Sequence, residues 1–250
     1  MKALIFAAGL GTRLRPITDS IPKALVPVGG VPMLERVIRK ISAAGISDIV
    51  VNAFHFSGKI VDFLGSRDFG VRVAVSLEEG AEPLETGGGI KHAEPLLRSC
   101  CREDCGRFLV HNADILSNAD LPALLAADRP DSLASLLVTD APADRYLLFD
   151  SEMRLAGWTN VRTGEVRSPY PGFDPSSCRR YSFCGISVVS EEVFPLMEEW
   201  PERFGIIDFY LSVCTEKKIR GVLATDLELI DIGSPEKLAE AESRISLFEQ

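Results

Sequence analysis

The residues from 7 to 28 form the stretch of the chain best suited to bind an anion. Gly9 and Gly11 follow a short apolar run at 2–6 that predicts a buried strand, and glycine lets the backbone come close to a ligand. The same stretch carries three positive charges, on Arg13, Arg15 and Lys23. Backbone N–H groups of a glycine-rich turn, together with clustered cations, bind the phosphates of nucleotides. The sequence therefore predicts a site for a nucleoside triphosphate at the end of the first strand.

This glycine-rich turn differs from two other common phosphate-binding loops. A Walker A loop has Gly-Lys-Ser/Thr at its end, whereas Gly11 is followed by Thr12 and Arg13. A dinucleotide fingerprint has a third glycine three positions after the second, and Leu14 stands there instead. Both a P-loop NTPase and a dehydrogenase are therefore disfavoured.

Four segments along the chain resemble the motifs of one enzyme family. They are GLGTRLRP at 9–16 with PKAL at 22–25, EPLETGGGI at 82–90, HNAD at 111–114 and DIGSP at 231–235. In this order they resemble the signature of the sugar-1-phosphate nucleotidylyltransferases, where HNAD is similar to an N-G-D metal turn and DIGSP to a D-x-G-T-P motif. The segment at 82–90 resembles most the N-acetylmuramate-1-phosphate uridylyltransferase branch.

The resemblance implies a reaction, a cofactor and catalytic residues. A nucleotidyl group would pass from a nucleoside triphosphate, UTP in this branch, to a sugar 1-phosphate such as N-acetylmuramate 1-phosphate, with release of pyrophosphate. Arg13 and Lys23 would be catalytic, Arg13 for the departing phosphates and Lys23 for the sugar phosphate or the α-phosphate. Asp114 and Asp231 would bind Mg²⁺, which prefers one or two carboxylates beside phosphate oxygens and water.

The resemblance and the residue types also suggest binding residues. The implied nucleotide-binding residues are Ala8, Gly9, Gly11, Thr12, Arg13, Glu85, Thr86 and Gly87. We expect the glycines at 87–89 to leave room for a flat base. Many relatives carry a Glu-Lys-Pro sugar motif where this chain reads AGWTN at 156–160. The substrate-binding candidates are therefore Lys23, Asn112, Arg145 and Asn160, followed by Tyr146, Trp158 and Asp208.

Other functions are compatible with the same motifs. A mannose- or heptose-1-phosphate guanylyltransferase is the nearest alternative, and a cytidylyltransferase comes next. A non-catalytic nucleotide-sugar sensor with the same fold represents a different class of protein. The presence of Arg13, Lys23, Asp114 and Asp231 together disfavours the sensor.

Composition limits the kinds of partner and location. The net charge of −9 disfavours nucleic acid as a partner. Residues 1–40 nevertheless carry seven Lys and Arg against two Asp and Glu, as expected for a site that binds small anions. The sequence has no run of about twenty apolar residues, so no membrane span is expected. It has six cysteines and no signal-peptide pattern, which indicates a reduced, cytoplasmic environment. We expect a monomer or small homo-oligomer.

The cysteines are expected to be structural. The cluster at 100, 101 and 105 has no second Cys or His pair nearby to complete a zinc site, so a surface loop is the default. Cys178, Cys184 and Cys214 are expected to be buried.

Alternating apolar segments predict the elements that position these residues. In the first half we expect strands at 2–6, 48–52, 71–76, 108–111 and 133–139, and helices at 33–44, 57–64, 89–98 and 121–127, with Ser57 as a possible N-cap. In the second half we expect a hairpin at 146–158, a surface loop at 162–177, strands at 181–189, 221–225 and 228–232, and helices at 191–200, 207–217 and 235–247.

This pattern, like the resemblance, predicts the fold class. We expect an α/β fold with a doubly wound, mixed, mainly parallel sheet flanked by helices, as in the Rossmann-type nucleotide-diphospho-sugar transferases. The prediction is one domain over 1–250, with a small β-rich sugar-side subregion at about 140–205 and no C-terminal hexapeptide-repeat domain. Ligands of such sheets bind beyond the carboxyl ends of the strands, where the glycine loop, the turn at 84–89 and Asp114 would meet.

Overall fold

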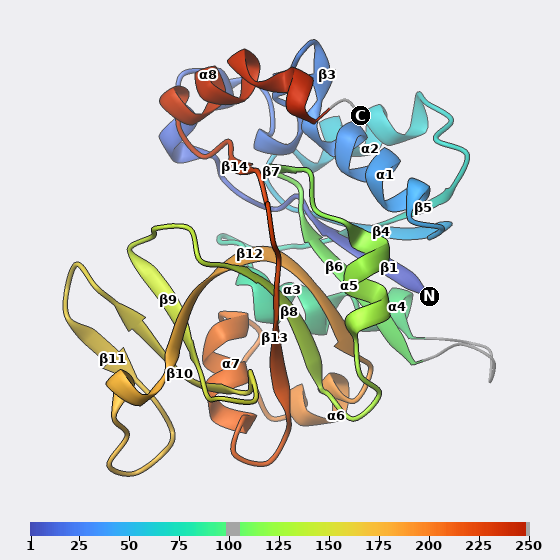
Figure 1. The fold of residues 1–250 in the computed structure, drawn as a ribbon. Helices are drawn as coiled ribbons and strands as arrows, with labels where there is room; N and C mark the ends of the chain where they lie inside the picture. Colours follow the sequence, from blue (N-terminus) through green and yellow to red (C-terminus); the bar gives the residue numbers. More distant parts are fainter. Residues whose placement is uncertain (99–105, 249–250) are drawn as a thin grey trace.

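The computed structural model describes residues 1–98 and 106–248 and contains a large mixed sheet. Its strand order is β11-β10-β9-β12-β6-β1-β4-β5, and β8 and β13 join beside β12 (Figure 1). The strands are β1 Lys2–Phe6, β4 Asp48–Ala53, β5 Arg72–Leu77, β6 Arg107–Asn112, β8 Ala134–Thr139, β9 Arg145–Phe149, β10 Leu155–Asn160, β11 Glu165–Arg167, β12 Arg179–Ser190 and β13 Ile219–Leu223. Strands β6, β1, β4 and β5 are parallel. The predicted fold class is confirmed.

Two short ladders lie beside the large sheet. Strand β14 (Leu229–Asp231) pairs with β7 (Ile115–Ser117), and β2 (Pro27–Val28) pairs with β3 (Val31–Pro32). Both ladders belong to the part of the molecule drawn above the large sheet in Figure 1.

Helices cover both faces of the sheet. One face packs against α1 (Met33–Ala43), α2 (Ser57–Gly65) and α5 (Leu121–Ala127), and the other against α3 (Glu85–His92), α4 (Glu94–Leu97), α6 (Val193–Met197) and α7 (Ile206–Val213). Because successive side chains of a strand alternate, Ala3 and Ile5 of β1 contribute to the first core and Leu4 to the second. Burial on both faces explains why these strands are nearly continuous apolar runs.

Strand β12 joins the parallel block to an antiparallel one. It pairs with β6, β8 and β9, and its register with β8 shifts between Phe183 and Ser187. Gly185 lies in this bulge with φ of +72°, and an added Cβ would lie 2.7 Å from Nδ2 of Asn112. The bulge lets β12 leave the central sheet and run towards β9, β10 and β11, within the predicted sugar-side subregion.

Several local predictions are wrong in their details. The helix expected at 89–98 begins at Glu85 and stops at His92, and α4 follows it; Pro95 lacks the N–H that would continue one helix across this point. Ser57 is not an N-cap, since Phe56 holds that position with no side-chain cap. The expected loop at 162–177 contains β11 and a 3₁₀ turn at Pro175–Ser177.

The remaining expectations concern cysteines and membranes. Cys184 and Cys214 are buried as predicted, whereas Cys178 is half-buried because it follows an exposed turn. The cluster at 100, 101 and 105 lies outside the described residues.

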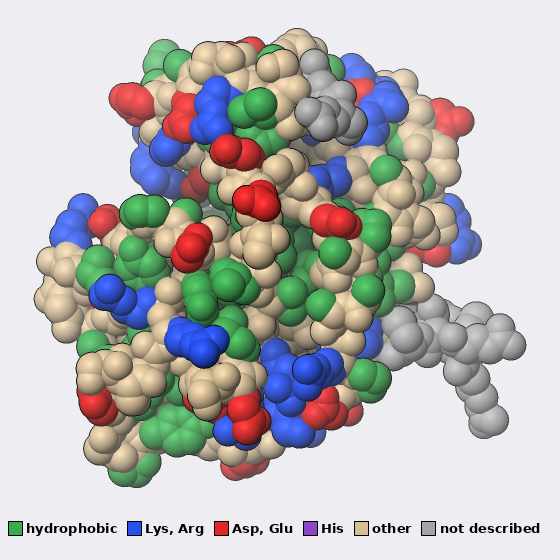
Figure 2. Space-filling model, in the orientation of Figure 1, with side chains coloured by type: hydrophobic (Ala, Val, Ile, Leu, Met, Phe, Trp, Pro, Cys, Tyr) green, Lys and Arg blue, Asp and Glu red, His purple; other side chains and the backbone are tan. Residues whose placement is uncertain are grey.

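Within 1–98 and 106–248, no helix has the length and apolar character needed to cross a membrane. Lys and Arg side chains are interspersed with Asp and Glu on the face shown in Figure 2.

Candidate active site

The glycine loop has a fixed shape. Gly11 has φ of +64°, and an added Cβ would lie 2.8 Å from Cγ2 of Thr18, so both backbone and space require glycine. Its carbonyl accepts hydrogen bonds from Thr18 Oγ1 at 2.7 Å and from the Leu14 N–H at 2.9 Å. Leu14 is fully buried in a small core with residues of β2, β14 and α8 (Pro235–Ser243). The loop is therefore anchored on one side while Arg13 remains exposed.

The two predicted metal ligands are brought together by the ladder of β7 and β14. The register places Asp231 opposite Ile115, one residue after Asp114, and the Ile232 N–H donates to the Asp114 carbonyl at 3.1 Å. Asp114 lies in the turn after β6, as predicted, although β6 extends one residue further than expected, to Asn112. Two carboxylates separated by more than a hundred residues thus lie at one carboxyl-terminal edge of the sheet.

Lys23 lies between these two carboxylates. Its ammonium forms an ion pair with Oδ2 of Asp114 and lies 3.2 Å from Oδ1 of Asp231. The lysine side chain is only 12% exposed, whereas those of Asp114 and Asp231 are 25% and 49% exposed. The cluster therefore carries a net charge of −1 and opens towards solvent on its carboxylate side.

The geometry of this cluster fits a divalent cation. The two carboxylates already share one cationic group, so they are spaced to hold a cation jointly. Among the residues the structure describes, no group of three or more His, Cys, Asp or Glu side chains could form a metal site. Mg²⁺ needs no such cage, since it takes one or two carboxylates and completes its shell with phosphate and water oxygens.

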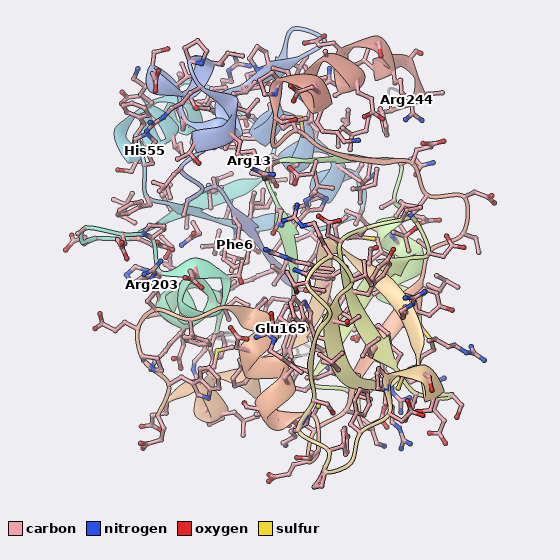
Figure 3. The ribbon with its side chains drawn as sticks, turned by 90° about the vertical axis from the view of Figure 1, so that its left-hand side faces the viewer. Phe6, Arg13, His55, Glu165, Arg203 and Arg244 are labelled. Carbon is pink, nitrogen blue, oxygen red and sulfur yellow. The ribbon has the colours of Figure 1, made fainter. Side chains whose placement is uncertain are left out.

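Arg13 lies next to the carboxylate cluster. An added Cβ on Gly233 would lie 2.6 Å from its guanidinium and 3.0 Å from Oδ1 of Asp231, so the guanidinium packs on the Gly233 backbone beside Asp231. Figure 3 shows Arg13 between the upper part of the molecule and the lower sheet, above Phe6 at the end of β1. The short DIGSP segment thus keeps the predicted catalytic arginine close to a predicted metal ligand.

A cavity of about 590 Å³ opens beside Arg13 and Asp231. Its lining joins the glycine loop to the antiparallel sheet and α7, and includes Arg13, Asp144, Arg145, Tyr146, Trp158, Arg167, Ser182, Phe183, Asp208 and Asp231. Four of the predicted sugar-side candidates, Arg145, Tyr146, Trp158 and Asp208, are therefore on one wall. The cavity spans the predicted phosphate end and the predicted sugar end of the site.

The other three substrate-binding candidates, Lys23, Asn112 and Asn160, do not line this cavity. The amide oxygen of Asn160 accepts the backbone N–H groups of Arg162 at 3.0 Å and Thr163 at 3.3 Å, and the side chain is buried. It stabilises the turn between β10 and β11. Asn112 ends β6 next to Gly185, close to Asp114 in sequence. Substrate binding by either asparagine stays a prediction.

Arg167 is a cavity residue that the sequence did not indicate. Its guanidinium stacks on the Trp158 ring at 4.0 Å from the centroid and pairs with Asp208 at the start of α7. The residue belongs to β11, in a stretch rich in Gly, Pro and Ser that reads as a loop. The stack and the ion pair fix the position of the indole on the cavity wall.

Two of the three glycines at 87–89, Gly87 and Gly88, pack against the segment before α7, whereas Gly89 faces Phe6 and Glu78. An added Cβ would lie 2.3 Å from the Phe204 ring at Gly87 and 2.0 Å from the Glu202 carbonyl oxygen at Gly88. The N–H groups of both glycines donate to the Phe204 carbonyl, at 2.9 and 3.2 Å. The space expected for a base is therefore absent at these two positions, and a nucleotide contact by Gly87 stays a prediction.

The residues before these glycines face the same segment. Thr86 Oγ1 accepts the Ile206 N–H at 3.1 Å, and Glu85 pairs with Arg203 at 3.2 Å. Glu85 has φ of +63° at the first position of α3.

Ala8, Gly9 and Thr12 lie in the exposed or half-buried part of the glycine loop, as a binding role requires.

A buried carboxylate was also missed from the sequence. Glu78 follows β5 and is only 6% exposed; it accepts hydrogen bonds from Asn52 Nδ2 and from the Leu84 N–H, both at 2.8 Å. A double glutamate directly after the strand at 72–77 was the available signal. Through Leu84, Glu78 links the end of β5 to the start of α3.

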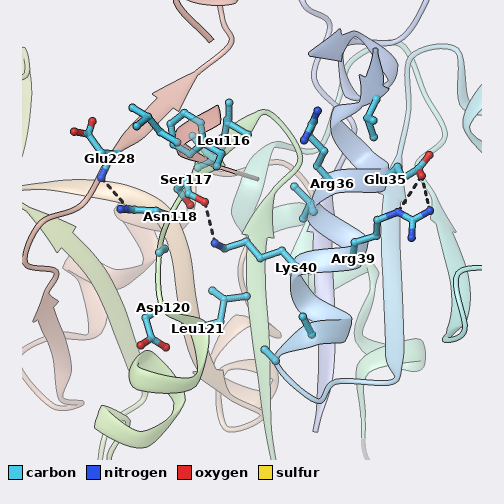
Figure 4. A pocket seen from close by; sticks show the side chains of 18 of the residues that line it. Glu35, Arg36, Arg39, Lys40, Leu116, Ser117, Asn118, Asp120, Leu121 and Glu228 are labelled. Atoms are coloured by element: carbon cyan, nitrogen blue, oxygen red, sulfur yellow. Dashed lines mark hydrogen bonds and ion pairs between the residues drawn. The ribbon is translucent and has the colours of Figure 1, made fainter. Parts of the chain in front are cut away.

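A larger cavity of about 1110 Å³ lies elsewhere, between α1, β7 and the start of α5 (Figure 4). Lys40 crosses it and donates to the Ser117 carbonyl at 2.9 Å, and its burial lowers its pKa. Its lining contains none of the predicted catalytic, nucleotide-binding or metal-binding residues. The smaller cavity, which Arg13 and Asp231 line, is therefore the candidate active site.

Comparison with known proteins agrees with the fold. A UDP-glucose pyrophosphorylase from Acinetobacter baumannii has the same fold, with a TM-score of 0.78 at 21% identity over 99% of this chain and 94% of that one. This likeness shows the fold. Residues 2–146 match the family model described as nucleotidyl transferase, so the chain belongs to that family.

Individual relatives narrow the class to enzymes acting on sugar phosphates. The N-acetylmuramate α-1-phosphate uridylyltransferase of Neisseria meningitidis is 39% identical over 163 residues, which are 62% of this chain and 68% of that protein. The protein of the same name from Caulobacter vibrioides is 28% identical over 98% of this chain and 96% of its own length. The resemblance based on the motifs is confirmed, and the activity is that of a sugar-1-phosphate nucleotidyltransferase.

Proposed function

We propose that this chain transfers a uridylyl group from UTP to N-acetylmuramate 1-phosphate in a Mg²⁺-dependent reaction. One observation carries the chemistry: Lys23, Asp114 and Asp231 converge from three distant segments, and Asp231 lines one cavity together with Arg13. The choice of UTP and of the amino sugar is supported by the similarity to two relatives named for that reaction.

The reaction needs no nucleophile from the protein. An oxygen of the sugar phosphate attacks the α-phosphorus of UTP, the bond from that phosphorus to the bridging oxygen breaks, and pyrophosphate leaves. The obstacle is the repulsion between two anions, so the protein contributes positioning and positive charge. Bound between Asp114 and Asp231, Mg²⁺ would neutralise phosphate charge as a Lewis acid.

The residues of the cluster have distinct parts in this scheme. Lys23 neutralises one carboxylate charge before substrates bind, and its ammonium is placed to move onto a phosphate oxygen. Arg13 lies at the edge of the cavity with a guanidinium that suits the oxygens of the leaving pyrophosphate. Leu14, buried below it, keeps this arginine at the cavity mouth.

The proposal is tested by a substrate matrix. Pyrophosphate release would be measured for the four nucleoside triphosphates, each with N-acetylmuramate 1-phosphate, N-acetylglucosamine 1-phosphate, glucose 1-phosphate and mannose 1-phosphate, with and without Mg²⁺. We expect the highest kcat/KM for UTP with N-acetylmuramate 1-phosphate, and none without a divalent ion. A clear preference for GTP and mannose 1-phosphate would contradict the proposed substrates, and no release with any pair would contradict the reaction.

A further inference from the structure

The charged residues of the active-site cavity differ in whether they already have partners. The three acidic residues of its lining are all in ion pairs: Asp208 with Arg167, Asp231 with Lys23 at 3.2 Å, and Asp144 with Arg162 at 3.7 Å. Asp144 and Asp208 thus each have an arginine partner, whereas Asp231 shares Lys23 with Asp114 at the proposed metal site.

The three arginines of the same lining divide differently. Arg167 forms ion pairs with Asp208 and, at 3.6 Å, with Glu165, and it stacks on the Trp158 ring. Across the described parts of the chain, neither Arg13 nor Arg145 has an ion pair or a side-chain hydrogen bond. The cavity thus contains two unpaired positive charges, one on the glycine loop and one at the start of β9.

Arg145 is well placed to be the second of two anion contacts. It is exposed, and its backbone is fixed by pairing with Asn160 across the β9–β10 ladder. Next to it, the Tyr146 hydroxyl accepts the Ala143 N–H at 2.8 Å, which fixes the entry to the strand. A guanidinium on a rigid strand loses little entropy when it binds a carboxylate in a bidentate manner.

We propose that Arg145 is a specificity residue that binds a carboxylate on the sugar, so that this cavity selects an acidic sugar 1-phosphate over its neutral counterpart. This inference rests on the proposed function. Arg13 is near the carboxylate cluster and serves phosphate, so a ligand that meets both arginines carries a phosphate and a second anion. N-acetylmuramate 1-phosphate has such a group in its lactyl carboxylate, whereas N-acetylglucosamine 1-phosphate lacks it.

The test compares these two sugars in the wild type and in variants of Arg145. Hydrogen bonds to charged groups contribute about 1.5–3 kcal/mol, so Arg145→Ala should lower kcat/KM for N-acetylmuramate 1-phosphate by about 10–100-fold. For N-acetylglucosamine 1-phosphate the change should stay below about threefold, since no carboxylate contact is lost. Arg145→Lys keeps the charge without the bidentate geometry and should recover part of the acidic-sugar activity only.

Arg179→Ala is the matched control. Arg179 is an exposed arginine at the start of the neighbouring strand β12, and it does not line the cavity. Its removal changes the net charge equally and should leave the acidic-to-neutral ratio unchanged. If it lowers that ratio as much as Arg145→Ala does, the effect is a general field effect and the proposal is wrong.

The outcomes separate this inference from the proposed function. An equal loss for both sugars in Arg145→Ala, or no loss for either, overturns the role of Arg145 while the reaction stands. A wild type that prefers GTP contradicts the proposed nucleotide, yet the ratio of the two sugars is still measured with GTP and decides the role of Arg145. A wild type that prefers the neutral sugar overturns both the sugar assignment and the selection by Arg145.

Discussion

The close packing at Gly88 gives a prediction with a calculable size. In Gly88→Ala, the added Cβ would lie 2.0 Å from the Glu202 carbonyl oxygen, where ordinary contact begins at about 3.4 Å. Helix α3 and the 202–206 segment would have to separate by about 1.4 Å, the difference between these distances. The position of the added Cβ and that of the Glu202 carbonyl oxygen are both fixed by the backbone, so a rotamer change cannot relieve the contact.

The hydrogen bonds across this contact set the magnitude. Four join the two segments: two from Gly87 and Gly88 to the Phe204 carbonyl, one from the Phe204 N–H to the Leu84 carbonyl at 3.2 Å, and one from the Ile206 N–H to Thr86. At roughly 0.5–1.5 kcal/mol each, their loss is worth about 2–6 kcal/mol. Alanine regains about 1 kcal/mol of helix propensity, which leaves a net destabilisation of about 3 kcal/mol.

Thermal and urea unfolding would measure this effect. For a chain of this length 1 kcal/mol corresponds to about 2–4 °C in Tm, so we expect a decrease of about 6–12 °C. Gly58→Ala is the control, because Gly58 is an exposed glycine of α2 with nothing within 4 Å of an added Cβ. It should raise Tm by about 2–4 °C through the same propensity gain. A Gly88→Ala protein as stable as the wild type would refute the packing explanation.

Further predictions concern the active-site charges and a buried histidine. Arg13→Ala should lower kcat by about 100-fold with an unchanged Tm, as for loss of one electrostatic contact in other sites; equal turnover would exclude its role. Lys23→Ala should strengthen binding of Mn²⁺ without nucleotide by roughly fivefold in calorimetry, since the ammonium no longer competes for partly exposed carboxylates, while kcat falls. Asp114→Asn and Asp231→Asn should each weaken that Mn²⁺ binding, and unaltered affinity in both would rule out the proposed ligands. Burial lowers the pKa of His111 to about 4, so below pH 6.5 the unfolded chain binds more protons than the folded one. As the pH falls from about 6.5 to 4, the free energy of unfolding should therefore decrease by up to about 3 kcal/mol. His111→Gln should flatten this part of the pH profile measured by urea unfolding.

The elements of the parallel block could be predicted because their sequence pattern follows from burial. Strand β1 begins and ends where the apolar run does, and α5 has the predicted bounds at Leu121–Ala127. The position of Asp114 after β6 followed from the same pattern. Its proximity to Asp231 did not, because no periodicity relates a turn near residue 114 to one near residue 231; the resemblance of the motifs to the family supplied that prediction.

Other features depend on contacts that composition cannot reveal. Three consecutive glycines fit a flexible turn as well as a closely packed helix, and Phe204, more than a hundred residues away, decides between them. Arg167 belongs to a three-residue strand in a polar stretch, and its partner Asp208 is 41 residues further along the chain. Such residues become visible only when the tertiary structure is known.

The pairing of β14 with β7 has a consequence for biosynthesis on the ribosome. The glycine loop and Asp114 are translated early, but the second carboxylate arrives only with residue 231 and reaches its place by closing a ladder onto residues 115–117. A nascent polypeptide halted before that point would keep its glycine loop while lacking half of the acidic pair. Under the proposed function, turnover therefore requires that translation has passed β14 and that this strand has paired with β7.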